Sequence, residues 1–260
     1  MKIYFLSYAT HDAMGFYKNQ DTLSNDALKY GNVDEVIKLR GNDINSGLTE
    51  IDSYLKGVKN KYPRIHKAKY YIWKSYVIKE ALKKINHLDV VIYHDVGRDC
   101  YPFKINDDLR WFCEYVQDNH RGLYVNFGPF QNRRFTKRDC FKVMNCDSEC
   151  YWNHKQANGS WSVYQKKPIV RKFVNEWYGY CTHPSMIVTD IESKVKEFDQ
   201  YEAHRHDQSI LTNMLIKYSK EHGLKLDPKT EGKLPRPWGW EKDMCLAISG
   251  IKKHICKNDK

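Results

Sequence analysis

Apolar and polar positions alternate along the chain with two periods, one typical of strands and one typical of helices. Residues 2–9 (KIYFLSYA) and 90–93 (VVIY) are short apolar runs rich in β-branched and aromatic side chains, which predicts buried strands. Residues 70–86 have apolar side chains at helical spacing with Lys and Glu between them, which predicts a helix. The same two periods predict strands over 122–127 and 161–164 and helices over 49–58, 106–119, 137–144, 168–181 and 207–219. They predict a loop or short helices over 10–32, and either a strand or a helix start over 33–39.

Strands that alternate with helices predict an α/β fold with a largely parallel sheet. From residue 228 onward the periodicity is lost and Pro, Gly and Trp become frequent, so we expect one domain over 1–227 and a C-terminal tail or lid over 228–260. Ligands of open α/β sheets bind outside the carboxyl ends of the strands. That rule singles out Ala9 and Thr10 after the first strand, and Asp95 after the strand over 90–93.

Composition narrows the class of protein. Hydrophobic residues make up 41% of the 260 residues, which fits a folded globular protein. The net charge of +11 is scattered in small clusters, which can attract phosphates, nucleic acid or an anionic membrane, or can consist of solvated lysines without a ligand. No nucleic-acid-binding signature accompanies it, so nucleic acid is not expected as a partner. No apolar run reaches 18 residues and no signal peptide is recognisable, so we expect a cytoplasmic protein without a transmembrane segment, for which peripheral membrane contact stays open. The eight cysteines form no CxxC pair and are expected to be reduced and structural.

The first candidate for chemistry is Asp95, which a hydrophobic strand delivers directly before a turn with Gly97. A carboxylate in that place can hold a divalent cation that bridges two phosphates. His94 beside it can assist, because Mn²⁺ accepts an imidazole ligand more readily than Mg²⁺ does. The alternative is an aspartate at a strand end that caps the next turn.

The second candidate is the polar segment HRHDQS over 204–209, which leads into an apolar-periodic helix. Asp207 can accept the proton of an attacking hydroxyl as a general base, and His206 can tune it or bind phosphate. The alternative for Asp207 is an N-cap. A third candidate is Lys74 in the first turn of the helix over 70–86, where an anion is favoured, with Tyr71 and Trp73 as ligand contacts or as core residues.

Four segments in this order resemble a family of small bacterial and large-virus glycosyltransferases with the GT-A, nucleotide-diphospho-sugar transferase fold. Members have a GYGYWIWKP-like segment, a strand ending in a DAG-type variant of the DxD metal motif, a Phe-x-x-x-Trp helix and an HRHDQS segment. The corresponding segments here are KYYIWKS over 69–75, VVIYHDVG over 90–97, KFVNEWYGYC over 172–181 and HRHDQSIL over 204–211. Lys69 and Ser75 replace the Gly and Pro of the family, and the DxD motif is reduced to the single acid Asp95.

The resemblance implies a mixed, mostly parallel GT-A sheet and an enzyme that moves a sugar from a nucleoside-diphosphate sugar to a glycan or glycoconjugate acceptor in the cytoplasm, including that of an infected host cell. By analogy, the donor would contact residues at the strand ends, the turn before the helix and the HRHDQS segment, namely Ala9, Thr10, Tyr71, Trp73, Lys74, His94, Asp95 and His206. Asp95 would hold Mn²⁺ or Mg²⁺, and Asp207 would deprotonate the acceptor in a direct displacement with inversion. Gln156 and Trp161 are expected on the acceptor side, because a Trp face stacks on a pyranose ring.

Two other functions compete with sugar transfer. The reduced DxD motif is compatible with a catalytically reduced protein that only binds a sugar nucleotide. A nucleic-acid-binding protein would rest on net charge alone and would show affinity that falls steeply with salt.

Overall fold

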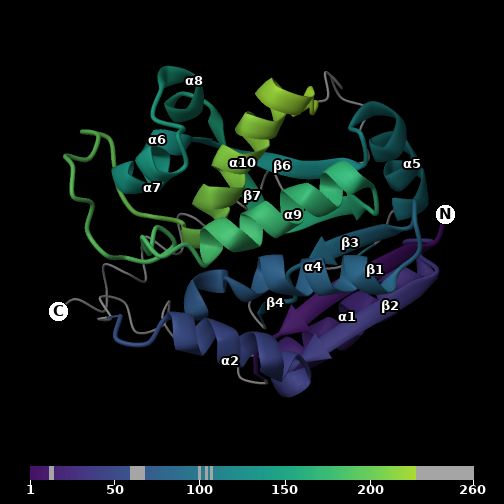
Figure 1. Ribbon diagram of the computed structural model, residues 1–260. Helices are drawn as coiled ribbons and strands as arrows, with labels where there is room; N and C mark the ends of the chain where they lie inside the picture. Colours follow the sequence, from purple (N-terminus) through teal and green to yellow (C-terminus); the bar gives the residue numbers. More distant parts are fainter. Residues whose placement is uncertain (12–14, 59–67, 99–100, 103–104, 106–107, 227–260) are drawn as a thin grey trace.

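A central five-stranded sheet organises the chain in the computed structural model, which describes residues 1–11, 15–58, 68–98, 101–102, 105 and 108–226 (Figure 1). The strand order is β2-β1-β3-β7-β6. The strands are β1 (Ile3–Ala9), β2 (Glu35–Arg40), β3 (Val90–His94), β6 (Leu123–Gln131) and β7 (Lys155–Gln165). A separate two-stranded sheet joins β4 (Gly97–Arg98) to β5 (Tyr101–Pro102).

Four of the five strands run in one direction. β1 pairs in parallel with both β2 and β3, whereas β7 is antiparallel to β3 and to β6. The register places Leu6 opposite Tyr93, so the residues that follow β1 and β3 lie at the same edge of the sheet. This edge, where β1 and β3 end, is called the carboxyl edge below.

Helices cover both faces of the sheet. α4 (Trp73–Lys84), α9 (Pro168–Cys181) and α10 (His206–His222) pack on one face, and α9 lies between the other two (Figure 1). α1 (Phe16–Lys29) and α5 (Leu109–Asn119) pack on the other face. The shorter elements are α2 (Asn45–Tyr54), α6 (Asn132–Phe135), α7 (Arg138–Val143), α8 (Glu149–Trp152) and the 3₁₀ turns η2 (Gly41–Ile44) and η3 (Lys69–Tyr71).

The alternation of side chains along the strands creates two hydrophobic cores. In β1, Leu6 and Tyr8 contact the core under α4, α9 and α10, while Ile3 and Phe5 contact the core under α1 and α5. β3 divides in the same way, so that Tyr93 belongs to the first core. Burial of such side chains from both faces is the main force that holds the sheet between its helices.

Local sequence signals explain where the helices of the first face begin and end. Pro168 occupies the first turn of α9, where its fixed φ is favourable and its missing N–H costs nothing. α10 ends at Gly223, whose φ of 63° lies in the left-handed region that glycine adopts without strain. Trp177, fully buried in the middle of α9, fixes that helix against its neighbours.

The predicted α/β class and mixed, mostly parallel sheet are confirmed, and the helix predicted over 168–181 has the bounds found here. The loop or short helices expected over 10–32 are a single helix of 14 residues, α1. The loop-rich stretch ahead of α9 instead contributes α6, α8 and most of β7. The tail predicted over 228–260 lies outside the described residues, and among the helices of the described part none is long and apolar enough to cross a bilayer. The described cysteines Cys113, Cys140, Cys146, Cys150 and Cys181 are free thiols, as expected.

Candidate functional site

Asp95 begins a cluster of charged groups at the carboxyl edge. Its backbone N–H donates to Ser160 O at 2.7 Å, which fixes the chain directly after β3 against β7. Its carboxylate accepts a hydrogen bond from the Tyr93 hydroxyl and faces Lys74, with Nζ 3.2 Å from Oδ1 and 3.3 Å from Oδ2. The side chain is 33% exposed, so it borders solvent while the groups behind it are buried.

Lys74 is a buried cation in the middle of this cluster. It projects from the first turn of α4, its side chain is only 8% exposed, and Nζ donates to Gly159 O at 2.8 Å. Burial alone would lower its pKa, but the nearby carboxylates of Asp95 and Asp207 outweigh burial and raise the pKa above its ordinary value. Lys74 therefore stays charged at neutral pH.

The turn η3, directly before α4, positions Lys74 and has an unusual backbone conformation. Lys69, Tyr70 and Tyr71 have φ values of 52°, 51° and 58°, a left-handed conformation that costs roughly 1–2 kcal/mol for each residue other than glycine. Trp73 secures the turn, because its indole N–H donates to Ala68 O at 3.2 Å and its ring packs edge-on against Tyr8. Strain of this kind collects at functional sites, where the surrounding structure compensates for it.

The rings around this turn also surround the ammonium group. Lys74 Nζ lies 5.8 Å from the ring centroids of Tyr71 and Trp73 and 5.4 Å from that of Tyr93. At these distances the electron-rich ring faces favour a cation. The predicted residues Tyr71 and Trp73 thus lie beside Lys74, Trp73 as a buried core residue and Tyr71 half-buried.

Asp207 is the second carboxylate beside Lys74. It lies in the first turn of α10, is 3% exposed, and its backbone carbonyl accepts a hydrogen bond from the Trp177 indole N–H at 3.1 Å. Its Oδ2 atom has no hydrogen-bond partner among the described residues. Burial raises its pKa from 3.8 to about 7, an effect that Lys74 opposes and the charge of Asp95 reinforces. Asp207 is therefore a carboxylate that exchanges its proton near neutral pH.

Gly159 connects these groups. A Cβ atom at this position would lie 3.6 Å from Lys74 Nζ and 3.9 Å from Asp207 Oδ2. The backbone of β7, without a side chain here, thus lies close to both the cation and the buried carboxylate. Gly159 and Tyr93 were not among the predicted site residues, although an isolated glycine inside a strand often marks a close approach.

His206 supports the wall of the site. Its φ of 49° is left-handed, its Nδ1 lies 2.9 Å from Val188 O, and its ring packs edge-on against Tyr70 at 5.1 Å. Burial lowers its pKa to about 4, so it is neutral at physiological pH. A neutral, buried imidazole does not suit the predicted role as a phosphate ligand and instead links η3, the 188 loop and α10.

The remaining predicted residues are placed apart from Lys74. Ala9 is buried at the end of β1, and Thr10 follows it half-buried. Gln156 is buried, its amide donates to Phe135 O at 3.1 Å, and its carbonyl accepts from Gln208, the neighbour of Asp207. Gln156 is thus part of the framework under α10.

Trp161 lies on the opposite face of the sheet. It is 4% exposed and packs between Phe112 and Tyr124, with ring centroids 5.4 Å away in both cases. The expectation that its ring stacks on an acceptor sugar does not agree with this placement, because both neighbours belong to the core under α5. Regular alternation would place Trp161 on the same face as Gly159, but the pairing of β7 with β6 is irregular between Ala157 and Ser162, and the Trp161 side chain lies on the face away from Lys74.

The residues around Asp95 do not fit a divalent metal. His94 projects to the other face, where it stacks on Phe5, and its Nδ1 lies against the Asp95 carbonyl. Within the described ranges no group of three or more His, Cys, Asp or Glu side chains could hold a metal. A cation on Asp95 would lie at most about 5 Å from Lys74 Nζ, a repulsion of about 7 kcal/mol at an effective dielectric constant of about 20. Asp99, the next acidic residue along the chain, lies outside the described residues.

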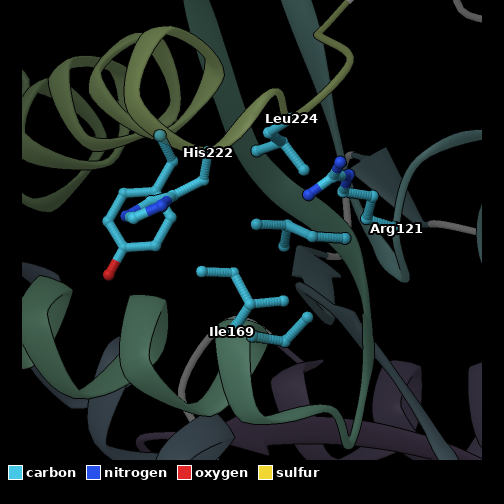
Figure 2. A pocket seen from close by; sticks show the side chains of 7 residues that line it. Arg121, Ile169, His222 and Leu224 are labelled. Atoms are coloured by element: carbon cyan, nitrogen blue, oxygen red, sulfur yellow. The ribbon is translucent and has the colours of Figure 1, made fainter.

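Two hollows lie outside the Lys74 cluster. Figure 2 shows the smaller, of about 10 Å³, where His222 and Leu224 at the end of α10 meet Ile169 and Arg121, far along α10 from Asp207. It has room for about one water molecule. The larger, of about 550 Å³, is lined by the end of β6, Arg134 and residues 199–202. The segment that forms one wall of this larger cleft runs directly into α10 and Asp207.

Comparison with known proteins identifies the fold. No protein-family model and no curated protein sequence matches the chain. Among solved structures, it is similar to the crystal structure of mouse xyloside xylosyltransferase 1 in its apo form, with a TM-score of 0.50 and 11% identity over 86% of this chain and 84% of that one. The chain therefore has a Rossmann-like fold of the kind found in a glycosyltransferase.

Proposed function

We propose that this protein is a glycosyltransferase that moves a sugar from a nucleoside-diphosphate sugar to a hydroxyl group of a glycan or glycoconjugate. One observation carries the proposal: the buried Asp207 carboxylate keeps one oxygen without a hydrogen-bond partner among the described residues, beside the charged Lys74. A general base needs such an oxygen and a pKa near the working pH. The fold shared with a xylosyltransferase supports the same reaction class.

The proposed reaction is a direct displacement. The acceptor oxygen forms a bond to the anomeric carbon as the bond from that carbon to the diphosphate breaks. The electron pair of the broken bond leaves with the nucleoside diphosphate, and the acceptor proton passes to Asp207 Oδ2. Attack from the face opposite the leaving group inverts the anomeric carbon, by the logic that separates inverting from retaining glycosidases.

Each partner has a place in this proposal. The nucleotide binds at the carboxyl edge beside Ala9 and Thr10, and its diphosphate approaches Lys74. The acceptor enters from the cleft of about 550 Å³, whose lining combines an aromatic ring, Phe130, with polar groups such as Gln131 and Glu202. Aromatic faces and hydrogen-bonding side chains are the groups that bind sugars.

A panel of UDP-, GDP- and dTDP-sugars screened by thermal shift tests the function. A donor present at about one hundred times its Kd stabilises the fold by about 2.7 kcal/mol, which raises the melting temperature by several degrees. The donor that shifts it is then assayed for release of nucleoside diphosphate, with and without glycan acceptors. Binding without release on any acceptor would favour a sugar-nucleotide-binding protein, and no shift with any donor would contradict both functions.

A further inference from the structure

We propose that Lys74, and not a divalent cation, neutralises the donor diphosphate, so that transfer proceeds without metal. This inference rests on the proposed function and concerns how the same site handles negative charge. In it, Asp95 is a positioning residue that holds the Lys74 ammonium.

The carboxylate of Asp95 is already committed inside the protein. Oδ1 accepts the Tyr93 hydroxyl, and Lys74 Nζ lies within 3.3 Å of both oxygens. Mg²⁺ or Mn²⁺ needs several oxygen or nitrogen ligands, and within the described ranges no group of three or more His, Cys, Asp or Glu side chains could supply them. The single neighbouring imidazole, that of His94, contacts Phe5 on the other face of the sheet.

Lys74 has the capacity to receive phosphate. An ammonium group has three N–H donors. One donates to Gly159 O at 2.8 Å, and a second faces Asp95 at 3.3 Å, which is longer than the 2.7–2.9 Å typical of charge-assisted bonds. The other Asp95 oxygen, Oδ1, lies at 3.2 Å from Nζ, which is also long for such a bond. The ammonium can therefore turn toward a phosphate oxygen while it keeps its anchor on Gly159.

Lys74 is the positive charge of the cluster, so it is the group to which the diphosphate binds. Asp207 must be ionised to act as a base, and Lys74 then faces two carboxylates, those of Asp95 and Asp207. When the diphosphate takes the Lys74 ammonium, the electron pair of the breaking bond develops next to a fixed positive charge, as electrostatic catalysis requires. The proton released by the acceptor is taken up by Asp207, so the proposed step needs no metal-bound group as a proton acceptor.

The experiment measures the affinity of the full chain for UDP, GDP and dTDP by calorimetry, in EDTA and in excess Mn²⁺ or Mg²⁺. We expect the Kd of the nucleotide that binds to agree within about threefold between the two conditions. Lys74→Met should weaken binding about ten- to hundredfold in both, the loss of one charge-assisted hydrogen bond. Lys74→Arg should restore part of the affinity because it keeps the charge, which a purely structural role would not predict.

Two further variants separate the role of the Asp95 carboxylate from a general effect of positive charge on the protein surface. Asp95→Asn should weaken binding by a smaller factor than Lys74→Met, equally with and without metal. Lys83→Met removes a charge from the exposed end of the same helix and should leave Kd unchanged. Thermal melting of each variant verifies that it is folded.

The outcomes distinguish this inference from the function on which it rests. Binding or turnover that requires Mn²⁺ or Mg²⁺, and a metal effect that disappears in Asp95→Asn, would overturn the inference and leave the glycosyltransferase intact. Failure of all three nucleoside diphosphates to bind in either condition would overturn the proposed function and this inference with it.

Discussion

Strand β3 has an aspartate at each end, and the two carboxylates have different surroundings. Asp89, before the strand, is 5% exposed and accepts backbone N–H groups from Lys2 at 2.7 Å and Asn86 at 3.1 Å, one on each oxygen. Asp95, after the strand, is 33% exposed and is held by the side chains of Tyr93 and Lys74. Backbone groups thus tie Asp89 to the fold, whereas Asp95 is held by side chains and borders solvent.

A second pair of carboxylates extends this contrast to the pKa. Burial would raise the pKa of Asp34, near the amino end of β1, but the Ile3 N–H and Arg110 outweigh it and the pKa is lowered. At Asp207, by contrast, burial outweighs the opposing effect of Lys74, and the pKa rises to about 7. Carboxylates that stabilise a fold are held ionised, and a carboxylate poised near neutrality is a candidate for chemistry.

The largest effect is expected from Asp207→Asn. This change removes the proton acceptor and keeps the shape of the side chain, so transfer should fall by about 10²–10⁴-fold in an assay of nucleoside diphosphate release. The free energy of unfolding should move the other way. Because the folded pKa of Asp207 is raised, the wild type loses stability as pH rises from about 4 to about 7, and the Asn variant does not.

Chemical denaturation at pH 8 should therefore show the Asn variant to be more stable, by up to about 4 kcal/mol. Equal stability of the two proteins at pH 8 combined with undiminished transfer would remove Asp207 from the mechanism. Denaturation at pH 4, where both side chains are neutral, is the internal control.

A smaller effect is expected from Lys74→Met on the pH dependence of transfer. Transfer by the wild type should rise with pH through about 7, as Asp207 loses its proton. Lys74 lowers the pKa of Asp207, so its removal should move this acidic limb to higher pH, measured as residual kcat/KM against pH. A limb that stays in place would show that Lys74 and the base are not electrostatically coupled.

Asp95→Asn should move the same limb in the opposite direction, and by less. The negative charge of Asp95 raises the pKa of Asp207, so its loss should shift the limb to lower pH. Asp95 affects the pKa of Asp207 less than Lys74 does, so we expect the smaller displacement here. Shifts of the same sign in the two variants would contradict the arrangement of one cation between two carboxylates.

Sequence patterns predicted the main elements and the residues of the candidate site, but not the contacts between them. Short apolar runs predicted β1 and β3. The rule for ligands at strand ends pointed to Asp95 and the polar segment over 204–209 pointed to Asp207, and the structure places both carboxylates near Lys74. The approach of Gly159 to Lys74 depends on the position of β7 beside β3 in the sheet, which no local pattern encodes.

Trp161 illustrates the same limit. A tryptophan near loop-rich sequence suggested a sugar contact, but the face on which it lies is set by the register of β7 against β3. His94 likewise follows Tyr93 by one residue and therefore projects to the opposite face of the sheet. His94 and Asp95, adjacent in the sequence and predicted to bind a metal together, therefore have side chains that point in different directions.

The smallest effect on activity is expected from Asp89→Asn, which tests the structural end of β3. An amide oxygen can accept one of the two backbone N–H groups, but the amide NH₂ would face the other, leaving a buried donor unsatisfied. The free energy of unfolding should fall by about 1–3 kcal/mol in chemical denaturation. Asp118→Asn, on the exposed side of α5, is the matched control and should change it by less than about 0.5 kcal/mol. Transfer by the folded Asp89→Asn protein should equal that of the wild type, and a loss of kcat at a temperature where it remains folded would show that the two ends of β3 are not separate in function.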